Sequence, residues 1–269
     1  MIIVVPMAGR GSRFLDTAYS NPEYKKPKPF INIKGKPMIA WALESLPFID
    51  LPSRPAKTDF KVKPAQLVFI CRRDHQDKFK IVNRLKGLFG QEIKTVLLDQ
   101  ITRGALETVL KAKKYINVNE EIIVSDSDHF FDGNYLYKTI KNKDTDTKGI
   151  IPVFPPPDEE VKWSYTLFDK NFKALAVGEK DFELAAKGAF ANIGGYYFSD
   201  GKFFVKHAEA MINEGEMYGA PGKQEFYVAP LYQRLIKKGY KVIVAVTPKV
   251  WGLGTPKDVS FFEQQENLS

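Results

Sequence analysis

Short apolar runs recur along the first part of the chain, and segments with helical periodicity separate them. The runs cover residues 1–5, 66–70, 94–98, 121–124 and 149–154. Runs of this kind are typical of strands that are buried on both faces of a parallel sheet. Between them, apolar residues spaced three or four apart, as at Ile39, Leu43 and Leu46, indicate helices. The alternation predicts an α/β fold with helices on both faces of the sheet.

The second half of the chain follows a different pattern. Residues 164–177 predict a β-hairpin that turns at 169–171, and residues 188–198 predict a further strand. Residues 229–239 predict a helix with Pro230 at its first position. A strand over 240–246 and a helix that starts after Thr255 as N-cap complete the expected order.

The charge balance suits an anionic partner. A net charge of +8 and a pI near 9.2 fit nucleic acid, a membrane surface or small phosphorylated molecules. No segment combines clustered Arg and Lys with aromatic residues in a recognisable nucleic-acid module, and no apolar run is long enough to span a bilayer. We therefore expect neither nucleic acid nor a membrane as partner, and homo-oligomerisation stays open.

Cysteine and histidine are scarce. The single cysteine, Cys71, excludes a disulfide within the chain and favours a reducing compartment. The N-terminus also lacks the pattern of a signal peptide, so we expect a cytoplasmic protein. The three histidines show no metal-ligand spacing, which argues against a zinc site.

A loop rich in glycine and arginine, Gly9 to Phe14, follows the first apolar run. Glycine lets backbone N–H groups approach an anion, and arginine matches the geometry of phosphate oxygens. The P-loop string is absent from the chain. The dinucleotide fingerprint also fails, because it requires a glycine where Phe14 stands. By itself the loop therefore predicts either phosphate binding of another kind or a simple turn after the strand.

A lysine-rich segment follows, in which Lys28 stands between two prolines that stiffen the backbone. Three strings in this region resemble the N-terminal signature of the sugar-1-phosphate nucleotidyltransferases (nucleoside-diphosphate-sugar pyrophosphorylases). They are Gly9-x-Gly11-x-Arg13, Pro27-Lys28-Pro29-Phe30 and Gly35-Lys36-Pro37. Later segments, among them 97–115, 121–131, 164–180, 192–198 and 251–258, also resemble this family, so the resemblance covers nearly the whole chain.

The resemblance implies a Rossmann-like three-layer α/β/α fold. Its mixed central sheet would be mainly parallel, and an added β-hairpin region would cover the acceptor site. It also implies a single nucleotidyltransferase domain over residues 1–269. About 1–135 would form the nucleotide-binding half, and about 136–269 the acceptor-binding half with the C-terminal elements.

The activity that the resemblance implies joins a nucleoside triphosphate to a phosphorylated acceptor, most often a sugar 1-phosphate, and releases pyrophosphate. The product would be an NDP-activated compound for surface polysaccharide or glycoconjugate synthesis, and the expected cofactor is Mg²⁺. The attacking phosphate oxygen is already anionic, so no strong general base is needed. The chemistry needs cations and alignment instead, because two highly charged molecules must meet.

The matching motifs assign residues to this reaction. Arg13 would neutralise the β- and γ-phosphates, and Lys28 would lie near the α-phosphate. The predicted nucleotide contacts are Ala8, Gly9, Gly11, Ser12, Arg13, Gln100, Gly104, Ala105 and Asp126. The predicted acceptor contacts are Ser164, Glu179, Lys180, Asn192 and Gly194. Asp128 would bind the metal ion. Many family members have a second metal-binding aspartate where this chain has Pro230, and Glu225 is predicted to replace it. His129 is expected to pack rather than to bind.

Several alternatives stay open. A cytidylyltransferase acting on a phosphorylated non-sugar such as phosphocholine would show nearly the same sequence. A metal-dependent glycosyltransferase of the GT-A type could use Asp126-Ser127-Asp128 as its Asp-x-Asp motif. The loss of an aspartate at Pro230 also leaves room for an inactive regulatory relative, although Arg13, Lys28 and Asp128 are retained.

Overall fold

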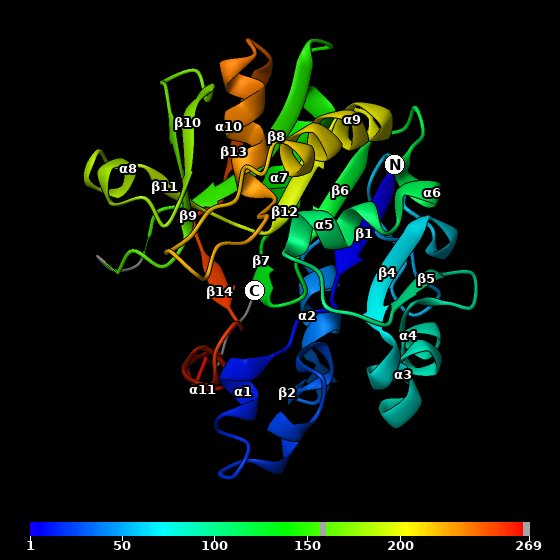
Figure 1. The fold of residues 1–269 in the computed structure, drawn as a ribbon. Helices are drawn as coiled ribbons and strands as arrows, with labels where there is room; N and C mark the ends of the chain where they lie inside the picture. The colour runs from blue at the N-terminus through cyan, green and yellow to red at the C-terminus, as the bar shows by residue number, and fades with distance from the viewer. Residues whose placement is uncertain (157–159, 266–269) are drawn as a thin grey trace.

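The computed structural model describes residues 1–156 and 160–265, and the described part of the chain forms a central ten-stranded sheet (Figure 1). Along the sheet the order is β10 (Ala174–Glu179), β9 (Ser164–Phe168), β11 (Phe190–Asn192), β8 (Thr147–Phe154), β12 (Gly195–Phe198), β6 (Ile122–Ser125), β1 (Ile2–Pro6), β4 (Leu67–Arg72) and β5 (Lys94–Leu98). A tenth strand, β13 (Lys241–Val246), pairs with β8. All five apolar runs form strands, as predicted. The expected domain end at residue 269 lies outside the described residues.

The direction of the strands divides the sheet into two parts. Strands β6, β1, β4 and β5 run parallel to one another. Strand β12 is antiparallel to both β6 and β8, and the hairpin β9–β10 joins the sheet through β11. The parallel part with its mixed extension matches the predicted sheet. Residues 188–198, expected as one strand, instead form β11 and β12, separated at Ile193 and Gly194.

Helices cover both faces of the sheet. On one face, α2 (Met38–Glu44), α4 (Ile81–Phe89) and α7 (Asn134–Asn142) pack with Ile3 and Val5 of β1. On the other, α5 (Ala105–Leu110), α9 (Gly201–Asn213) and α10 (Ala229–Lys237) pack with Ile2 and Val4. Because neighbouring strand residues point to opposite faces, β1 contributes to both cores. The three-layer α/β/α architecture is confirmed.

The remaining elements are short. The helices are α1 (Ser12–Leu15), α3 (Arg73–Phe79), α6 (Lys113–Ile116), α8 (Phe182–Ala186) and α11 (Pro256–Glu263), with 3-10 turns at Pro22–Lys25, Lys28–Phe30 and Pro64–Gln66. Two small antiparallel pairs join β2 (Asn32–Ile33) to β3 (Lys36–Pro37) and β7 (His129–Phe131) to β14 (Val250–Gly252). Within the described ranges, the helices are too short or too polar to cross a membrane.

A third apolar cluster joins the beginning of the chain to its last helix. The cluster includes Phe14, Trp41, Trp251 and Phe262. The rings of Trp41 and Phe262 meet edge to face, with centroids 5.0 Å apart. Figure 1 shows α1, β2 and α11 together at the lower end of the molecule. This packing holds the N-terminal loop against the C-terminal segment.

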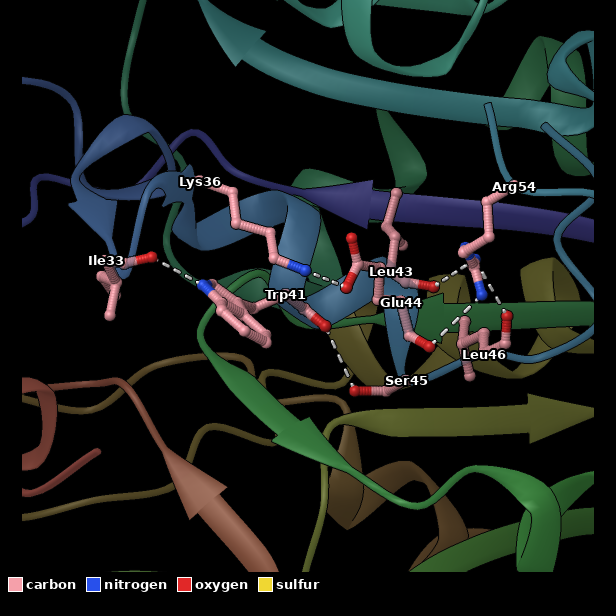
Figure 2. Close-up of polar contacts among 8 residues, drawn as sticks. All are labelled: Ile33, Lys36, Trp41, Leu43, Glu44, Ser45, Leu46 and Arg54. Carbon is pink, nitrogen blue, oxygen red and sulfur yellow. Dashed lines mark hydrogen bonds and ion pairs between the residues drawn. The ribbon is translucent and has the colours of Figure 1, made fainter. Parts of the chain in front are cut away.

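Arg54 stabilises the C-terminal end of α2 (Figure 2). Its guanidinium donates to the backbone carbonyls of Leu43 and Leu46, at 3.3 and 3.4 Å, and to that of Glu44 at 3.5 Å. The last carbonyls of a helix lack partners within the helix, so a cation at this end satisfies them and opposes the helix dipole. Arg54 thereby ties the loop after α2 to the helix that precedes it.

Candidate active site

Two cavities meet at the carboxyl ends of β1 and β6, where the loops after these parallel strands lie side by side. The first, which we call the N-loop cavity, has a volume of about 380 Å³ and is bordered by Gly9, Gly11, Ser12 and Lys28, among others. The second, the hairpin cavity, has a volume of about 440 Å³ and extends towards β9, β10 and β11. Five lining residues belong to both: Arg13, Asp126, Asp128, Tyr227 and Gly254. The two cavities are therefore halves of one cleft.

The loop after β1 has the conformation that its glycines allow. Gly11 adopts φ +66°, in the left-handed region, and precedes α1. A Cβ at Gly11 would also lie 3.4 Å from the Cβ of Lys28, so the two segments of the predicted signature pack against each other. Arg13 is exposed on the first turn of α1 and reaches both cavities. This arrangement brings backbone donors and two cations to one wall of the cleft.

Lys28 and Asp128 form an ion pair at the centre of the cleft. The Nζ of Lys28 lies 2.5 Å from Oδ2 of Asp128. Burial would raise the pKa of Asp128, but the charge and hydrogen bond of Lys28 outweigh it and hold that pKa below its usual value. Asp128 is therefore ionised at neutral pH. It offers a carboxylate where phosphate groups would meet a cation.

Asp126 lies beside this pair in a tight backbone environment. Its N–H donates to the carbonyl of Gly194 at 2.7 Å. A Cβ at Gly194 would lie 2.0 Å from Oδ2 of Asp126, so a larger residue at 194 would displace this carboxyl group. Burial, and next the charge of Asp128, raise the pKa of Asp126 to about 7. The gap between β11 and β12 thus makes room for Asp126.

His129 completes a group of potential metal ligands. A ring nitrogen of His129 and a carboxylate oxygen from each of Asp126 and Asp128 lie within 4.8 Å of one another. Burial lowers the pKa of His129 to about 4, so its imidazole is neutral at pH 7. Two carboxylates and a neutral imidazole fit a divalent cation. This position makes His129 a candidate ligand, and the expectation that it packs rather than binds stays a prediction.

The predicted second metal residue, Glu225, is not among the residues that line either cavity. It is exposed and exchanges two backbone hydrogen bonds with Tyr218. Glu225 is not part of the only three-membered ligand group found among residues 1–156 and 160–265. Pro230, the substituted position, is buried at the second residue of α10, one place later than predicted. A metal role for Glu225 stays a prediction.

Four of the five predicted acceptor residues line the hairpin cavity: Ser164, Glu179, Asn192 and Gly194. Oδ1 of Asn192 accepts from the Thr166 hydroxyl at 2.6 Å, while its buried Nδ2 has no partner among the described residues. An unpaired buried donor is costly, and a ligand oxygen would satisfy it. The pKa of Glu179 is raised by burial.

Lys180 lies at the edge of the same cleft rather than in its wall. Its Nζ is 5.7 Å from the ring centroid of Tyr227, which lines both cavities. Its backbone N–H donates to the carbonyl of Trp163 at 2.9 Å, which fixes the turn after β10. Lys180 is exposed and stands close enough to the cleft to approach an anion there.

The predicted nucleotide residues fall into two groups. Besides the N-loop residues, Ala105 and Asp126 line the N-loop cavity. Ala8, Gln100 and Gly104 are not among its lining residues, and Gln100 is exposed. The turn that holds Gly104 is joined to Phe226, whose carbonyl accepts from Leu106 N–H at 2.9 Å. This turn positions Ala105 at the cavity.

Lys36, in the third part of the signature, has a structural contact rather than a place in the cleft (Figure 2). Its Nζ lies 2.5 Å from Oε2 of Glu44 and 3.9 Å from the ring centroid of Trp41. The indole N–H of Trp41 in turn donates to the carbonyl of Ile33 at 2.9 Å. These contacts join the β2–β3 turn to α2, and so support the segment that carries Lys28.

Several lining residues were not predicted. Tyr227 and Gly254 border both cavities, and Asp258 borders the hairpin cavity. The Thr255 hydroxyl accepts from the N–H of Asp258 at 3.2 Å, so the expected N-cap is confirmed, and it also contacts Oδ2 of Asp258 at 2.7 Å. The segment 251–258 is predicted both as a helix start and by its resemblance to the family, but neither prediction assigns Gly254 or Asp258 to the cleft.

Comparison with known proteins identifies the fold. No protein-family model and no curated protein sequence matches the chain. Solved structures do match. The nucleoside-diphosphate-sugar pyrophosphorylase from Vibrio cholerae RC9 has 22% identity and a TM-score of 0.73, over 98% of this chain and 100% of that one.

Two further structures match over comparable lengths. A putative glucose-1-phosphate thymidylyltransferase from Bacillus anthracis, in complex with a sucrose, has 15% identity and a TM-score of 0.68. The inositol-1-phosphate CTP transferase from T. maritima has 12% identity and a TM-score of 0.67. Each match covers 100% of this chain and 97% of the other. The resemblance seen in the sequence is thereby confirmed for the fold, along the described chain.

Proposed function

We propose that the chain is a nucleotidyltransferase that joins a nucleoside triphosphate to a phosphorylated acceptor and releases pyrophosphate. The observation that carries this proposal is the Lys28–Asp128 pair, which stands where the two cavities meet. A reaction between two anionic substrates needs a cation and a carboxylate at their junction, and the cleft supplies both. The matched structures, whose titles name such transferases, support the same activity.

In the proposed reaction an oxygen of the acceptor phosphate forms a bond to the α-phosphorus of the triphosphate. The bond from that phosphorus to the bridging oxygen breaks, and pyrophosphate carries away the electron pair. Lys28 would contact the α-phosphate, and Arg13 would neutralise the leaving phosphates. Backbone N–H groups of residues 9–12 would surround them. Alignment in the cleft would supply much of the rate.

A divalent cation, for which the predicted choice is Mg²⁺, would neutralise charge on the phosphate oxygens when it is bound by Asp126, Asp128 and His129. The residues themselves have a further role. The Lys28–Asp128 pair holds the ammonium group towards the shared wall of the two cavities, so Lys28 needs little reorganisation when the substrates bind.

The acceptor half would bind a polar phosphorylated molecule, and a sugar 1-phosphate is our first choice. The unpaired Nδ2 of Asn192 offers a donor, and Glu179 offers an acceptor for hydroxyl groups. Lys180 would contact the acceptor phosphate from the rim. We further propose that the product serves polysaccharide or glycoconjugate synthesis. The chain would then work as one domain, in which about 1–135 binds nucleotide and about 136–269 binds acceptor.

A pyrophosphate-release panel tests the proposal. CTP, UTP, dTTP, GTP and ATP are each combined with hexose 1-phosphates, inositol phosphate and phosphocholine, in the presence of Mg²⁺ or Mn²⁺. We expect release with one base and one class of acceptor, and phosphocholine would identify the alternative cytidylyltransferase. If no pair releases pyrophosphate, but a nucleotide sugar yields free nucleoside diphosphate, the cleft is that of a glycosyltransferase and the proposal is wrong.

A further inference from the structure

The ligand group at the centre of the cleft contains a donor that a magnesium site does not need. Mg²⁺ prefers oxygen ligands and retains much of its water. Imidazole nitrogen suits the first-row transition ions better. His129, with a ring nitrogen within 4.8 Å of both carboxylates, is therefore a clue to which ion the site selects.

The surroundings of His129 distinguish it from a histidine that only fills space. Its side chain is 7% exposed, and its Nε2 has no hydrogen-bond partner within the described part of the chain. His207 is equally buried, and its Nε2 also lacks a partner there, but its ring lies among aromatic rings, 4.5 Å from Phe203 and 5.4 Å from Tyr240. The ring of His129 also lies 5.4 Å from that of Phe131, but His129 borders the cleft beside two carboxylates, whereas His207 lines neither cavity.

Backbone hydrogen bonds hold all three ligands in place. His129 pairs with Gly252 across the β7–β14 ladder, and the carbonyl of Asp128 accepts from the N–H of Leu253 at 2.8 Å. The N–H of Asp126 donates to Gly194. Ligands held by backbone hydrogen bonds lose little freedom when an ion binds, so their identity controls the selectivity of the site.

The charge balance of the group also favours an ion. Asp126 and Asp128 approach each other closely, and the ammonium of Lys28 contacts Asp128. Lys28 forms an ion pair with Asp128 but not with Asp126, so the second carboxyl group has no cation beside it among the described residues. A divalent cation would balance the pair and would also give the nitrogen of His129 a partner.

We propose that His129 is a nitrogen ligand of this site, together with Asp126 and Asp128, and that the site prefers Mn²⁺ to Mg²⁺. This preference applies to the metal ion of the proposed reaction and so rests on the proposed function. The evidence for it is the set of ligands, and the rate of the reaction is not used. Mn²⁺ accepts mixed oxygen and nitrogen ligands, whereas Mg²⁺ gains little from an imidazole.

Metal binding by the free protein tests the inference. Free Mn²⁺ is measured by electron paramagnetic resonance during titration of the nucleotide-free chain, and Mg²⁺ is then added as competitor. We expect one Mn²⁺ per chain and Mg²⁺ at least about tenfold weaker. In His129→Gln, whose amide oxygen suits a hard ion, Mn²⁺ affinity should fall about 10- to 100-fold while Mg²⁺ affinity stays within about twofold.

His207→Gln is the matched control, since it removes a buried imidazole with the same unpaired nitrogen from a site without carboxylates. It should bind Mn²⁺ as the unmodified chain does, and thermal unfolding of both variants shows that the fold is kept. If His129→Gln does not fold, Co²⁺ bound to the unmodified chain should show nitrogen hyperfine or ligand-field features of an imidazole.

Three results would overturn the inference: no Mn²⁺ binding by the unmodified chain, equal selectivity in a folded His129→Gln, or Co²⁺ spectra with oxygen ligands only. The pyrophosphate panel gives an independent outcome. A chain that binds Mn²⁺ through His129 but releases no pyrophosphate would contradict the proposed function and leave the metal inference intact.

Discussion

Gly194 and Gly195 are neighbours in the sequence, yet the structure predicts opposite consequences of adding one methyl group. A Cβ at Gly194 would lie 2.0 Å from Oδ2 of Asp126 and 2.3 Å from its Cγ. A Cβ at Gly195 would meet nothing nearer than Cγ of Pro152 at 3.4 Å, which is an ordinary contact. Gly194→Ala should therefore displace Asp126, whereas Gly195→Ala should be accommodated.

The size of the effect follows from the overlap. To restore an ordinary contact of about 3.4 Å, Asp126 or the strand break must move by more than about 1 Å, and overpacking of this kind costs about 1–3 kcal/mol. For a chain of this length each kcal/mol lowers Tm by about 2–4 °C, so Gly194→Ala should lose several degrees. A shift of about 1 Å in a metal ligand should also weaken Mn²⁺ binding and lower turnover by about 100-fold.

Thermal unfolding, Mn²⁺ titration and pyrophosphate release together test this reasoning. Gly195→Ala should keep its Tm within about 2 °C, because a Gly→Ala change that fits the backbone reduces the entropy of the unfolded chain and offsets mild crowding. If Tm and Mn²⁺ affinity fall equally in the two variants, or fall further in Gly195→Ala, then the absence of a side chain at Gly194 is not what accommodates the carboxyl group of Asp126.

Three further predictions use other parts of the molecule. Lys28→Ala and Asp128→Asn should each lower the rate of pyrophosphate release by about 100-fold or more with little change in Tm; near-normal turnover would remove that residue from the mechanism. Arg54→Met should lower the free energy of unfolding by about 1–3 kcal/mol in guanidinium titrations, because the carbonyls at the end of α2 lose their donor. Unchanged stability would show that Arg54 does not cap this helix. Cys71 is buried, and burial raises the pKa of its thiol to about 12. A thiol reagent at pH 8 should therefore react with Cys71 only after unfolding. Rapid reaction of the folded chain would contradict this burial.

Much of the fold was predictable because its information is local. Apolar runs identified the strands, and the hairpin signal at 169–171 marked the boundary between β9 and β10. The observed elements differ from the predicted ones where a single residue interrupts the sequence pattern. Between β4 and β5 the chain forms two helices, α3 and α4, which are divided at Lys80, where φ is 52°. The strand expected at 188–198 is interrupted at Ile193 and Gly194, where the carbonyl of Gly194 accepts from the N–H of Asp126 in the loop after β6.

The candidate site was predictable where its residues are contiguous. The loop from Gly9 to Arg13 and the acidic pair after β6 were visible as motifs, and the structure brings them to one cleft. Tyr227 was not predicted, because it lies far along the chain from the other cleft residues. The position of the His129 ring near both carboxylates was not predicted either, because no local pattern shows that the short strands β7 and β14 pair at this residue.

The contact between Phe14, Trp41, Trp251 and Phe262 has a consequence for biosynthesis. A ribosome makes β1 and the glycine-arginine loop more than about 200 residues before Gly254, which lines the same cavity. At ordinary elongation rates the interval is on the order of ten seconds or more. During that time the loop after β1 lacks its aromatic partners from the C-terminal segment. The cleft can therefore form only after residues 251–262 have been made.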